Sequence, residues 1–413
     1  MTLAYKYRMY PTKEQATTLA SFFGCTRLLY NELLSWWKTE YDAAKQEERK
    51  MGKLPLVTFF KQQHDFLDAV DSLALMNARR HLEAALKLCF KNKTSRFPRF
   101  KKRGKSRDSY TTSCVNGNIA VGDGTVRLPK LGSVRCVTHR RLPDGAKILT
   151  ATVSRERDGR HYVSVCFEIE QNTYAQRKAD GDMKVVGLDM SMRQFAVSSD
   201  GNDDVAKTKY VARYRESERK MRRLSREVSR KKAGSNNRDK AKRRLARLSQ
   251  RVSNRRRDFC IKTAVHYATN YDVIVLEDID MKNMSRTLNL GKSVMDLGFG
   301  EFRKWLDWQC VKHGSAVFYA DRWFASSKTC NRCGEKNDGL KLSDRRWICP
   351  HCGAEIDRDY NAACNLRDYF LKIYNTAGTA EINASGDNVR NVVASLQRSV
   401  SMKEEAAWSL AKR

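Results

Sequence analysis

Long apolar runs are absent from this chain of 413 residues. No uninterrupted apolar stretch approaches the roughly 18 residues that a membrane-spanning helix requires, which disfavours a membrane partner. The segment from Met1 to Lys13 also lacks the apolar core of a secretory signal peptide. We therefore expect a cytoplasmic protein, whose cysteine thiols stay reduced.

Acidic residues are also scarce. The chain has 47 Asp and Glu residues against 79 Lys and Arg residues, so its formal net charge is +32. A surface of that sign attracts polyanions, and each neutralised phosphate of a nucleic acid releases a counterion. Nucleic acid is therefore the expected partner, and a merely basic surface is the alternative. The length of the chain predicts several domains.

Without a secretion signal, the twelve cysteines are not expected to form a disulfide framework. Two CxxC pairs, separated by fifteen residues, are formed by Cys330, Cys333, Cys349 and Cys352. A glycine, Gly334 or Gly353, follows each pair and permits the turn that points backbone amides at sulfur. This set predicts one structural Zn²⁺, because four thiolates leave no open coordination position. A redox CxxC motif is the alternative.

The first half of the chain switches between strand and helix patterns. Residues 1–10 alternate aromatic and polar side chains, and Thr12 with Gln15 forms a capping-box start for a helix. Apolar residues at helical spacing predict that residues 13–95 are mostly helical. Residues 118–170 have a period of two broken by turns, which predicts a small β-barrel. The strand at 1–10 is compatible with joining that barrel, with the helical segment as an insertion.

Two segments concentrate positive charge. Between Phe97 and Arg107, six cationic side chains are interleaved with two phenylalanines, and the aromatic Tyr110 follows in the same segment. We interpret this segment as a strap across phosphates, with a solvated basic loop as the alternative. Residues 211–257 predict a helical hairpin with a cationic surface, with a solvated coiled coil as the alternative. In these segments the residues expected to bind nucleic acid are Arg99, Lys101, Lys102, Arg103, Lys220, Arg222, Arg223, Arg226, Arg230, Lys231 and Lys232.

Three carboxylates stand at the ends of expected strands or on a following helix. Asp189 and Glu277 each end a short apolar run, and the run before Glu277 has the character of a buried parallel strand. Asp278 is adjacent but would point to the opposite face. Asp359 lies in a segment whose Ala and Asn spacing predicts a helix packed against a sheet.

These acids suit metal-dependent phosphodiester hydrolysis. An acid at the tip of a buried strand must be solvated, and a metal ion at the edge of a sheet can do this. Hydrolysis with two divalent ions requires several hard oxygen ligands, which three carboxylates provide. No nitrogen or sulfur ligand stands beside them, so Mg²⁺ is the expected metal. The pattern indicates an RNase H-type nuclease.

The order of the motifs along the chain is distinctive. It runs from Gly187-Leu-Asp189 through Leu276-Glu277-Asp278 and the two cysteine pairs to Asp357-Arg-Asp359-Tyr-Asn361-Ala-Ala. In this order the sequence resembles the TnpB family, transposon-encoded relatives of the type V CRISPR nucleases. The resemblance spans about residues 3 to 370.

The resemblance implies an α+β multidomain fold, in which an RNase H-like (RuvC) α/β nuclease domain contains an inserted zinc ribbon that binds target nucleic acid. A β-barrel wedge domain would carry a helical recognition insertion, and the basic hairpin would belong to the nuclease domain. The expected parts are a wedge barrel (1–12 and 97–178), a helical recognition domain (13–96), a nuclease domain (179–325 and 353–375), a zinc ribbon (326–352) and a partly disordered tail (376–413).

The same resemblance implies an RNA-guided DNA endonuclease. A guide RNA copied from the transposon end would pair with one strand of target DNA, the protein would read a short flanking motif, and one active site would cut both strands. The partners would be the guide RNA and double-stranded DNA, with a monomeric protein bound to the RNA. The expected cofactors are two Mg²⁺ ions at the active site and one structural Zn²⁺.

Motif by motif, the resemblance assigns the catalytic and magnesium-binding roles to Asp189, Glu277 and Asp359. Asp359 is preferred to Asp357 because it directly precedes the x-Asn-Ala-Ala element. Asp357 stays open as the alternative third acid. Arg346 is a candidate for contacting the scissile phosphate. Residues 72–80 fall where the flanking motif would be read.

Three other functions fit parts of the pattern. A nuclease-dead repressor of the same family would need a broken set of acids, and all three acids are intact. An RNase H-like transposase that acts without RNA is disfavoured by the position of the ribbon and by the lack of a separate helix-turn-helix motif. A compact type V CRISPR effector stays open.

Overall fold

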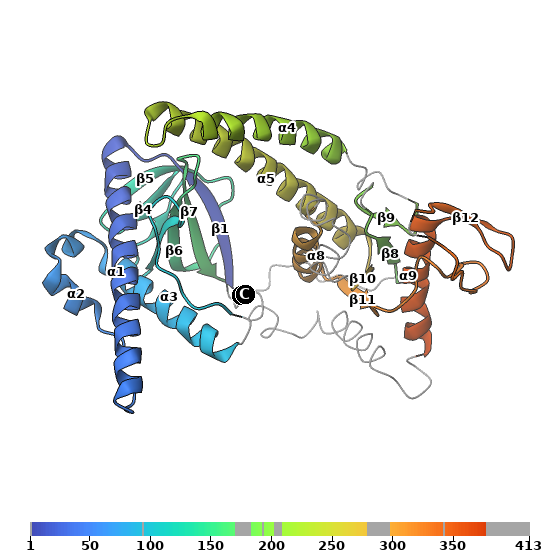
Figure 1. Cartoon of the computed structure of the whole chain (residues 1–413), viewed down its shortest axis with the longest axis horizontal. Coiled ribbons are helices and arrows are strands. Elements are labelled where there is room, and N and C mark those ends of the chain that lie inside the picture. Colours follow the sequence, from blue (N-terminus) through green and yellow to red (C-terminus); the bar gives the residue numbers. More distant parts are fainter. Residues whose placement is uncertain are drawn as a thin grey trace. The chain divides into compact units, whose positions relative to one another are not determined.

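The computed structural model of the chain describes residues 2–92, 95–169, 183–191, 194–201, 209–278, 298–341 and 343–376, with the backbone alone for 209–215 and 376. These residues divide into two compact units, 2–169 and 183–376, each described by itself below (Figure 1). The described residues end at 376, so the predicted tail from residue 377 onward lies outside them. No helix in the described ranges is long and apolar enough to cross a membrane.

Unit 1 contains one seven-stranded antiparallel sheet. Its strands are β1 (Thr2–Met9), β2 (Asp108–Ser113), β3 (Ala120–Val121), β4 (Thr125–Leu128), β5 (Gly132–Val137), β6 (Lys147–Arg155) and β7 (His161–Glu168). Their order is β2-β6-β7-β1-β5-β4-β3, so the N-terminal strand lies between β7 and β5. The expectation that residues 1–10 join the later strands is confirmed, and closure into a barrel stays a prediction.

The helices of unit 1 pack on this sheet. They are α1 (Lys13–Gln46), α2 (Val57–Gln63), the 3₁₀ helix η1 (Asp65–Ala69) and α3 (Ser72–Lys91). The predicted capping box is present, because the Thr12 hydroxyl accepts from the Gln15 N–H at 3.2 Å and the Gln15 side chain accepts from the Thr12 N–H at 3.1 Å. Leu29 of α1, Leu82 of α3 and Val163 of β7 share one buried core. The helical expectation for residues 13–95 is therefore confirmed.

Unit 2 contains a four-stranded mixed sheet. Its strands are β8 (Val185–Asp189), β9 (Val197–Ser198), β10 (Val273–Glu277) and β11 (Ala316–Ala320), in the order β11-β10-β8-β9. Strand β10 runs parallel to both β8 and β11, and β9 runs antiparallel to β8. The two apolar runs that end in Asp189 and Glu277 are therefore strands, as predicted.

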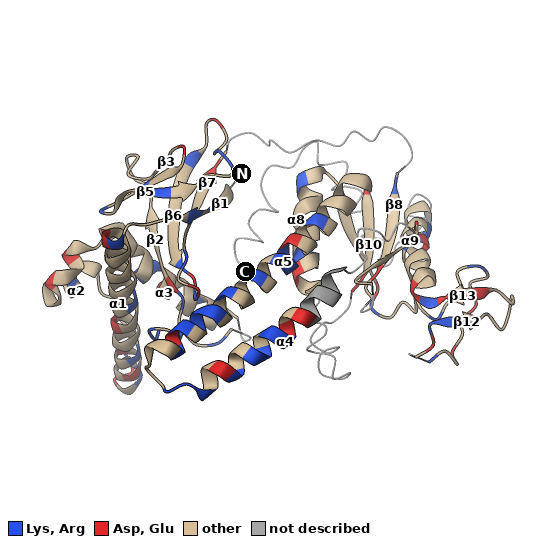
Figure 2. Ribbon diagram, turned by 90° about the horizontal axis from the view of Figure 1, so that it is seen from above, with Lys and Arg blue, Asp and Glu red and all other residues tan. Residues whose placement is uncertain are grey.

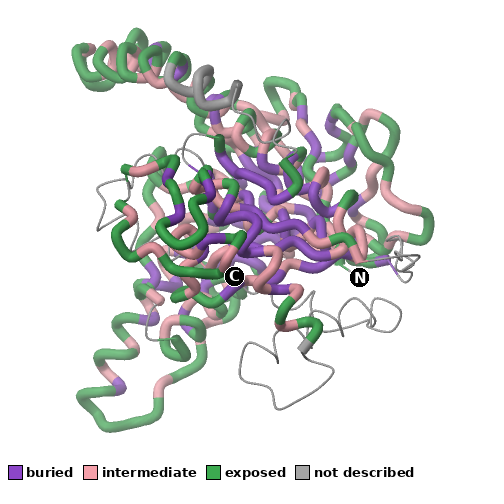
Figure 3. Tube along the Cα trace, turned by 90° about the vertical axis from the view of Figure 1, so that its right-hand side faces the viewer, coloured by how far each residue is buried: buried purple, intermediate pink, exposed green. Residues whose placement is uncertain are grey.

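Helices cover both faces of this sheet. They are α5 (Asn236–Asn270), α8 (Phe299–His313) and α9 (Arg358–Thr376), while α4 (Lys209–Arg230) packs along α5. Leu188 and Leu276 pack with residues of α5 and α8, whereas Val275 packs on the other face against Leu366 and Phe370 of α9. Buried positions accordingly gather in the strands and on the inward sides of the helices (Figure 3). The sheet is the middle of three layers.

The helical hairpin is longer than its predicted limit at residue 257. Its second helix, α5, begins after the cap Ser235 and continues to Asn270. The added length is buried, because Cys260, Ala264 and Tyr267 pack with α8 and the sheet. The basic composition marks only the exposed part of a helix whose C-terminal part belongs to the core.

Candidate active site and metal centre

The carboxyl ends of the parallel strands bring two predicted acids together. Leu188 and Leu276 are partners in register, so the next residues, Asp189 and Glu277, end neighbouring strands that are about 4.8 Å apart. Side chains alternate between the faces of a strand. Gly187 and Val275 lie on the face covered by α9, so both acids point to that face.

Asp189 is the most perturbed of these acids. Burial, and then repulsion by the carboxylates of Glu277 and Asp359, raise the pKa of Asp189 well above its usual value, against the opposing charges of Arg358 and Arg345. All three predicted acids therefore lie within electrostatic reach of one another. A divalent cation bound among these acids would relieve their mutual repulsion.

Asp359 lies in the first turn of α9. Its Oδ2 atom accepts a hydrogen bond of 3.2 Å from the hydroxyl of Ser191, two residues after Asp189. Asp357 instead uses Oδ1 to accept from the backbone N–H groups of Asp359 and Tyr360, both at 3.1 Å, as a helix cap does. The geometry favours Asp359 over Asp357 as the third acid.

A glycine sets the distance between α9 and strand β8. A Cβ atom on Gly187 would lie 2.0 Å from the carbonyl oxygen of Ala363 and 2.7 Å from the backbone nitrogen of Arg367. Both atoms belong to the backbone of α9 and cannot move without the helix. Because α9 carries Asp359, this close contact fixes the third acid relative to Asp189.

Replacing Gly187 by alanine is expected to push α9 outward. We expect a loss of about 3 kcal/mol or more in the free energy of unfolding of unit 2, because the added methyl group overpacks a backbone contact. Thermal melting and nuclease assays measure the effect. Gly300→Ala is the matched control, because nothing lies within 4 Å of a Cβ at that position of α8. Equal melting temperatures for the two variants would contradict the prediction.

The two residues after Leu276 have separate partners. Glu277 Oε1 accepts a short hydrogen bond from the hydroxyl of Ser326. The Asp278 carboxylate is held by Arg303 of α8 at 3.3 Å and by Arg322 at 3.1 Å. The two neighbouring acids thus face different partners, and Asp278 is neutralised by arginines.

The four predicted cysteines form a cluster. The Sγ atoms of Cys330 and Cys352 are 3.7 Å apart, as are those of Cys333 and Cys349, and all four lie within 4.8 Å of one another. A tetrahedron with metal–sulfur bonds of about 2.3 Å has edges of about 3.8 Å. The cysteines therefore fit one tetrahedral metal ion.

Backbone amides complete the cysteine cluster. Gly334 and Gly353 adopt positive φ angles of 80° and 68°, and their N–H groups bond the carbonyls of Cys330 and Cys349 at 2.8 and 2.9 Å. Backbone N–H groups of Cys352 and His351 lower the pKa of Cys349 to about 6, whereas, against the N–H of Glu335, desolvation and the other three thiols raise the pKa of Cys333 to about 12. Cys349 therefore ionises more readily than Cys333. The hairpin of β12 (Arg346–Ile348) and β13 (Glu355–Asp357) supports the second pair.

Two buried asparagines connect the first cysteine pair to α9. The side-chain amides of Asn361 and Asn365 each donate to the carbonyl of Thr329 at 2.7 Å, and Asn365 also donates to that of Ser326 at 2.7 Å. Asn361 accepts in return from the backbone N–H of Asn331 at 2.9 Å. Because Ser326 also bonds Glu277, the cysteine segment is linked to two of the three acids. Sequence reasoning missed these links.

Two arginines lie beside the acids: Arg358, whose Nη2 atom is 3.3 Å from Asp359 Oδ1, and Arg345. The Nη1 atom of Arg345 lies 3.1 and 3.2 Å from the two carboxylate oxygens of Asp359. The predicted Arg346 is mostly exposed and pairs with Glu355 across the hairpin at 3.7 Å, so its contact with a phosphate stays a prediction. Arg345 directly precedes β12, and no local pattern in the sequence distinguishes it from Arg346.

Only part of the predicted basic strap is exposed to solvent. Arg99, Lys102 and Arg103 are exposed. The ammonium group of Lys101 lies 3.8 Å from the ring centre of Tyr30, and burial lowers the pKa of Lys101. Strand β2, which begins at Asp108, was not predicted, because Tyr110 was assigned to the strap rather than to the core that contains it.

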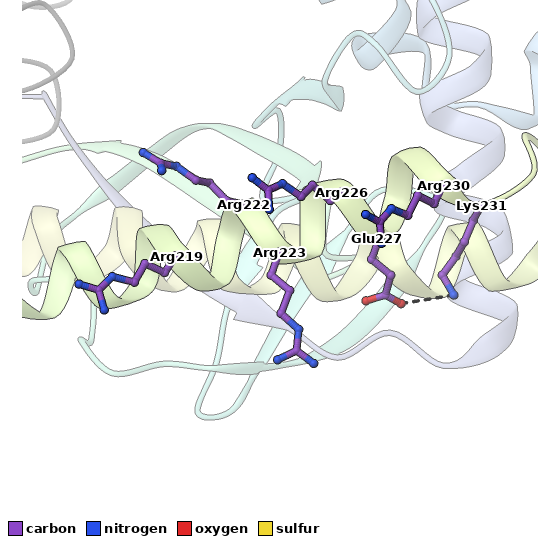
Figure 4. A pocket seen from close by; sticks show the side chains of 7 residues that line it. All are labelled: Arg219, Arg222, Arg223, Arg226, Glu227, Arg230 and Lys231. Atoms are coloured by element: carbon purple, nitrogen blue, oxygen red, sulfur yellow. Dashed lines mark ion pairs between the residues drawn. The ribbon is translucent and has the colours of Figure 1, made fainter.

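Lys and Arg positions are spread along both helices of the hairpin, α4 and α5 (Figure 2). An open groove of about 710 Å³ on α4 is lined by Arg219, Arg222, Arg223, Arg226, Glu227, Arg230 and Lys231. Figure 4 shows Arg222 and Arg226 on one side of the helix and Arg223 on another.

Three of the seven predicted cations of this hairpin have acidic partners. Ion pairs join Lys220 to Glu216 at 2.6 Å, Arg222 to Glu218 at 2.8 Å and Lys231 to Glu227 at 3.3 Å. Within the described ranges, no ion pair engages the remaining cations, which are Arg223, Arg226, Arg230 and Lys232. These four unpaired cations are the ones available to bind phosphates.

Unit 2 thus combines an acid cluster at a sheet edge, four cysteines that fit one metal ion, and a basic hairpin with a surface suited to polyanions. Family models described as "Probable transposase" and "Cas12f1-like, TNB domain" match residues 164–288 and 299–366. A third, described as "Helix-turn-helix domain", matches residues 1–46. This match differs from our expectation that such a motif is lacking, yet residues 2–46 fold as β1 and the single helix α1.

Relatives match most of the chain. A protein of Streptomyces pristinaespiralis named "Putative RNA-guided DNA endonuclease" is 35% identical over 392 residues, which cover 94% of this chain and 92% of the relative. "Putative RNA-guided DNA endonuclease InsQ" of Escherichia coli strain K12 is 28% identical, with coverage of 88% and 91%. The chain belongs to the TnpB family of such proteins.

A solved structure shares the fold. The complex described as Cas12f1 with sgRNA and target DNA matches with a TM-score of 0.52 and 12% identity, covering 89% of this chain and 98% of that chain. At such identity the likeness concerns architecture alone. The chain therefore has a mixed α/β fold like that of Cas12f1.

Proposed function

We propose that the protein is an RNA-guided DNA endonuclease that hydrolyses both strands of a target beside a short flanking motif. The observation that carries the proposal is the convergence of Asp189, Glu277 and Asp359 at the carboxyl edge of the unit 2 sheet. We propose the guide RNA and the DNA target from the names of its relatives. An intact set of acids argues against a nuclease-dead repressor.

The three acids would hold two Mg²⁺ ions. Carboxylate oxygens are the ligands that Mg²⁺ prefers, and the repulsion that raises the pKa of Asp189 is removed when cations bind. Such ions supply the positive charge that stabilises the attacking and leaving oxygens of the phosphodiester. Cation binding would also release Arg345 from Asp359, which frees its guanidinium group to bind a phosphate oxygen of the scissile strand.

The remaining elements have proposed roles around this centre. Unit 2 would be an RNase H-like (RuvC) domain, and its four cysteines would hold a structural Zn²⁺ in the target-nucleic-acid-binding segment. The unit 1 sheet would be a wedge barrel that carries α1 to α3 as the recognition insertion. On α3, the exposed residues Ser72, Met76 and Arg80 recur every four residues and form a stripe that could read the flanking motif.

The unpaired arginines of α4 would bind the backbone of the guide RNA or its heteroduplex with DNA. Arg226 and Arg230 are four residues apart along the helix, a rise of about 6 Å. Recognition of a heteroduplex through its backbone requires charge without base readout. This part of the hairpin meets that requirement.

Replacing Arg226 by glutamine is expected to weaken RNA binding about 5- to 10-fold and to lower the salt slope of the affinity by about 1, because one phosphate contact is lost. Filter binding of the guide RNA between 50 and 200 mM salt, roughly the range in which phosphate contacts dominate, measures both quantities. Lys220→Gln is the control, because Lys220 is already paired with Glu216. Equal losses in the two variants would show that net charge alone acts.

The proposed function is tested by sequencing the RNA that copurifies when the protein is expressed with its native flanking DNA. One discrete species that ends in flank-derived sequence is expected, and the complex should cut DNA that matches this end when Mg²⁺ is present. Random host fragments without guided cleavage would overturn the proposal and favour a transposase that acts without RNA.

A further inference from the structure

One tryptophan stands out on the loop that follows β11. Trp323 has 87% of its surface exposed, whereas the other tryptophans in the described ranges are buried or half-buried. Exposing an indole of this size to water is unfavourable, since aromatic side chains bury large apolar areas when they can. The exposure therefore needs an explanation from function.

The loop is held rigidly on both sides of Trp323. Arg322 bonds the Asp278 carboxylate at 3.1 Å, and the backbone N–H of Trp323 bonds Asp321 Oδ1 at 2.8 Å. The next residue, Phe324, turns inward and packs on Tyr369, with the ring centres 4.5 Å apart. The indole is thus presented outward from an anchored turn.

The turn lies at the edge of the sheet that carries the acids. Glu277 pairs in register with Ala320 at the end of β11, so the loop after β11 begins beside the end of β10. Arg322 contacts the residue after Glu277, and Ser326 contacts Glu277 itself. Trp323 lies between these two anchors, next to the proposed active site.

We propose that Trp323 is a stacking platform for an unpaired base of the DNA strand that enters the active site. This inference rests on the proposed function. It adds that the DNA strand is unpaired where it meets the acids. Any base can stack on an indole, because every base has a π face, so the contact holds the strand without selecting a sequence. Lys328 supplies positive charge within the same loop, while Arg322 is engaged by Asp278.

The test uses the protein–guide complex and single-stranded DNA that is complementary to the guide RNA. Trp323→Leu, which keeps an apolar side chain without a π face, is expected to lower kcat/KM of cleavage roughly 10- to 100-fold, the range for loss of one base stack. Trp323→Phe should retain most activity. Phe66→Leu, at an exposed aromatic residue of unit 1, should cleave like the wild type.

Abasic sites moved one position at a time along the DNA identify the base. At one position an abasic site should slow the wild type as much as Trp323→Leu does, and should slow that variant no further. Cleavage by Trp323→Leu at the wild-type rate would overturn the stacking role. The stacking role would also be overturned if Trp323→Leu bound guide RNA more weakly but cut DNA normally once saturated with RNA. The indole would then contact the guide RNA instead. Failure of the wild type to cut any guide-matched DNA would instead overturn the proposed function, and the stacking role with it.

Discussion

Asp189→Asn is expected to reduce guided DNA cleavage at least 1,000-fold, which corresponds to about 4 kcal/mol of transition-state stabilisation. The amide keeps the size of the side chain but removes a negative charge from the proposed magnesium site. The measurement is a single-turnover cleavage rate with the complex in excess over DNA. Binding of target DNA in Ca²⁺ should be unchanged, because the acids contact metal ions rather than the heteroduplex.

The same substitution should leave the metal-free protein as stable as the wild type or more stable. Burial and two neighbouring carboxylates raise the pKa of Asp189, so its ionised form is destabilised by charges that an amide does not feel. Loss of activity without loss of stability separates a metal ligand from a structural residue.

Asp278→Asn is the matched control for this experiment. Asp278 directly follows Glu277 in the chain, but its carboxylate pairs with Arg303 and Arg322. We expect cleavage to fall no more than about 10-fold, because a charge is removed outside the acid cluster. If Asp189→Asn cleaves within 10-fold of the wild type, roughly the range expected of this control, the assignment of the active site is wrong.

Cys330→Ser is expected to lose the bound zinc and guided cleavage together. Binding of structural zinc to four thiolates contributes about 10–16 kcal/mol to the fold of such a segment, so the loss of one ligand should unfold it. Metal analysis should find one zinc per chain in the wild type and none in the variant. Thermal melting should show a lower transition or an additional early one.

Cleavage should fall with the zinc because the cysteine segment supports the acids. Ser326 bonds Glu277, and Asn361 and Asn365 bind the segment to α9, which carries Asp359. Cys89→Ser, at a half-buried cysteine in unit 1, is the control and should keep both zinc and activity. A Cys330→Ser protein with wild-type zinc content and melting temperature would contradict this role of the cluster.

The strand ends and the cysteine pairs could be predicted because their signals are local. Asp189 and Glu277 each end a continuous apolar run, and such a run is a strand wherever it is buried on both faces. The two CxxC pairs need only their own turns, which Gly334 and Gly353 provide. No distant partner had to be known in either case.

The features that were missed depend on residues far apart in the sequence. The need for Gly187 arises from the backbone of Ala363, and the links of Asn361 and Asn365 lead to Ser326 and Thr329. Strand β2 was hidden because the basic run before it drew Tyr110 into the wrong segment. A period or a spacing cannot reveal such contacts, because the partners belong to other elements.

The topology of unit 2 has a consequence for protein synthesis. The third acid of the proposed site lies on α9, which begins at Arg358, 169 residues after Asp189. Chains grow from the N-terminus at about 5–20 residues per second, so a ribosome completes β8 and β10 well before α9. A polypeptide released by premature termination before α9 therefore lacks part of its cutting centre. Such a fragment is expected to lack nuclease activity, because Asp359 is missing from the proposed site.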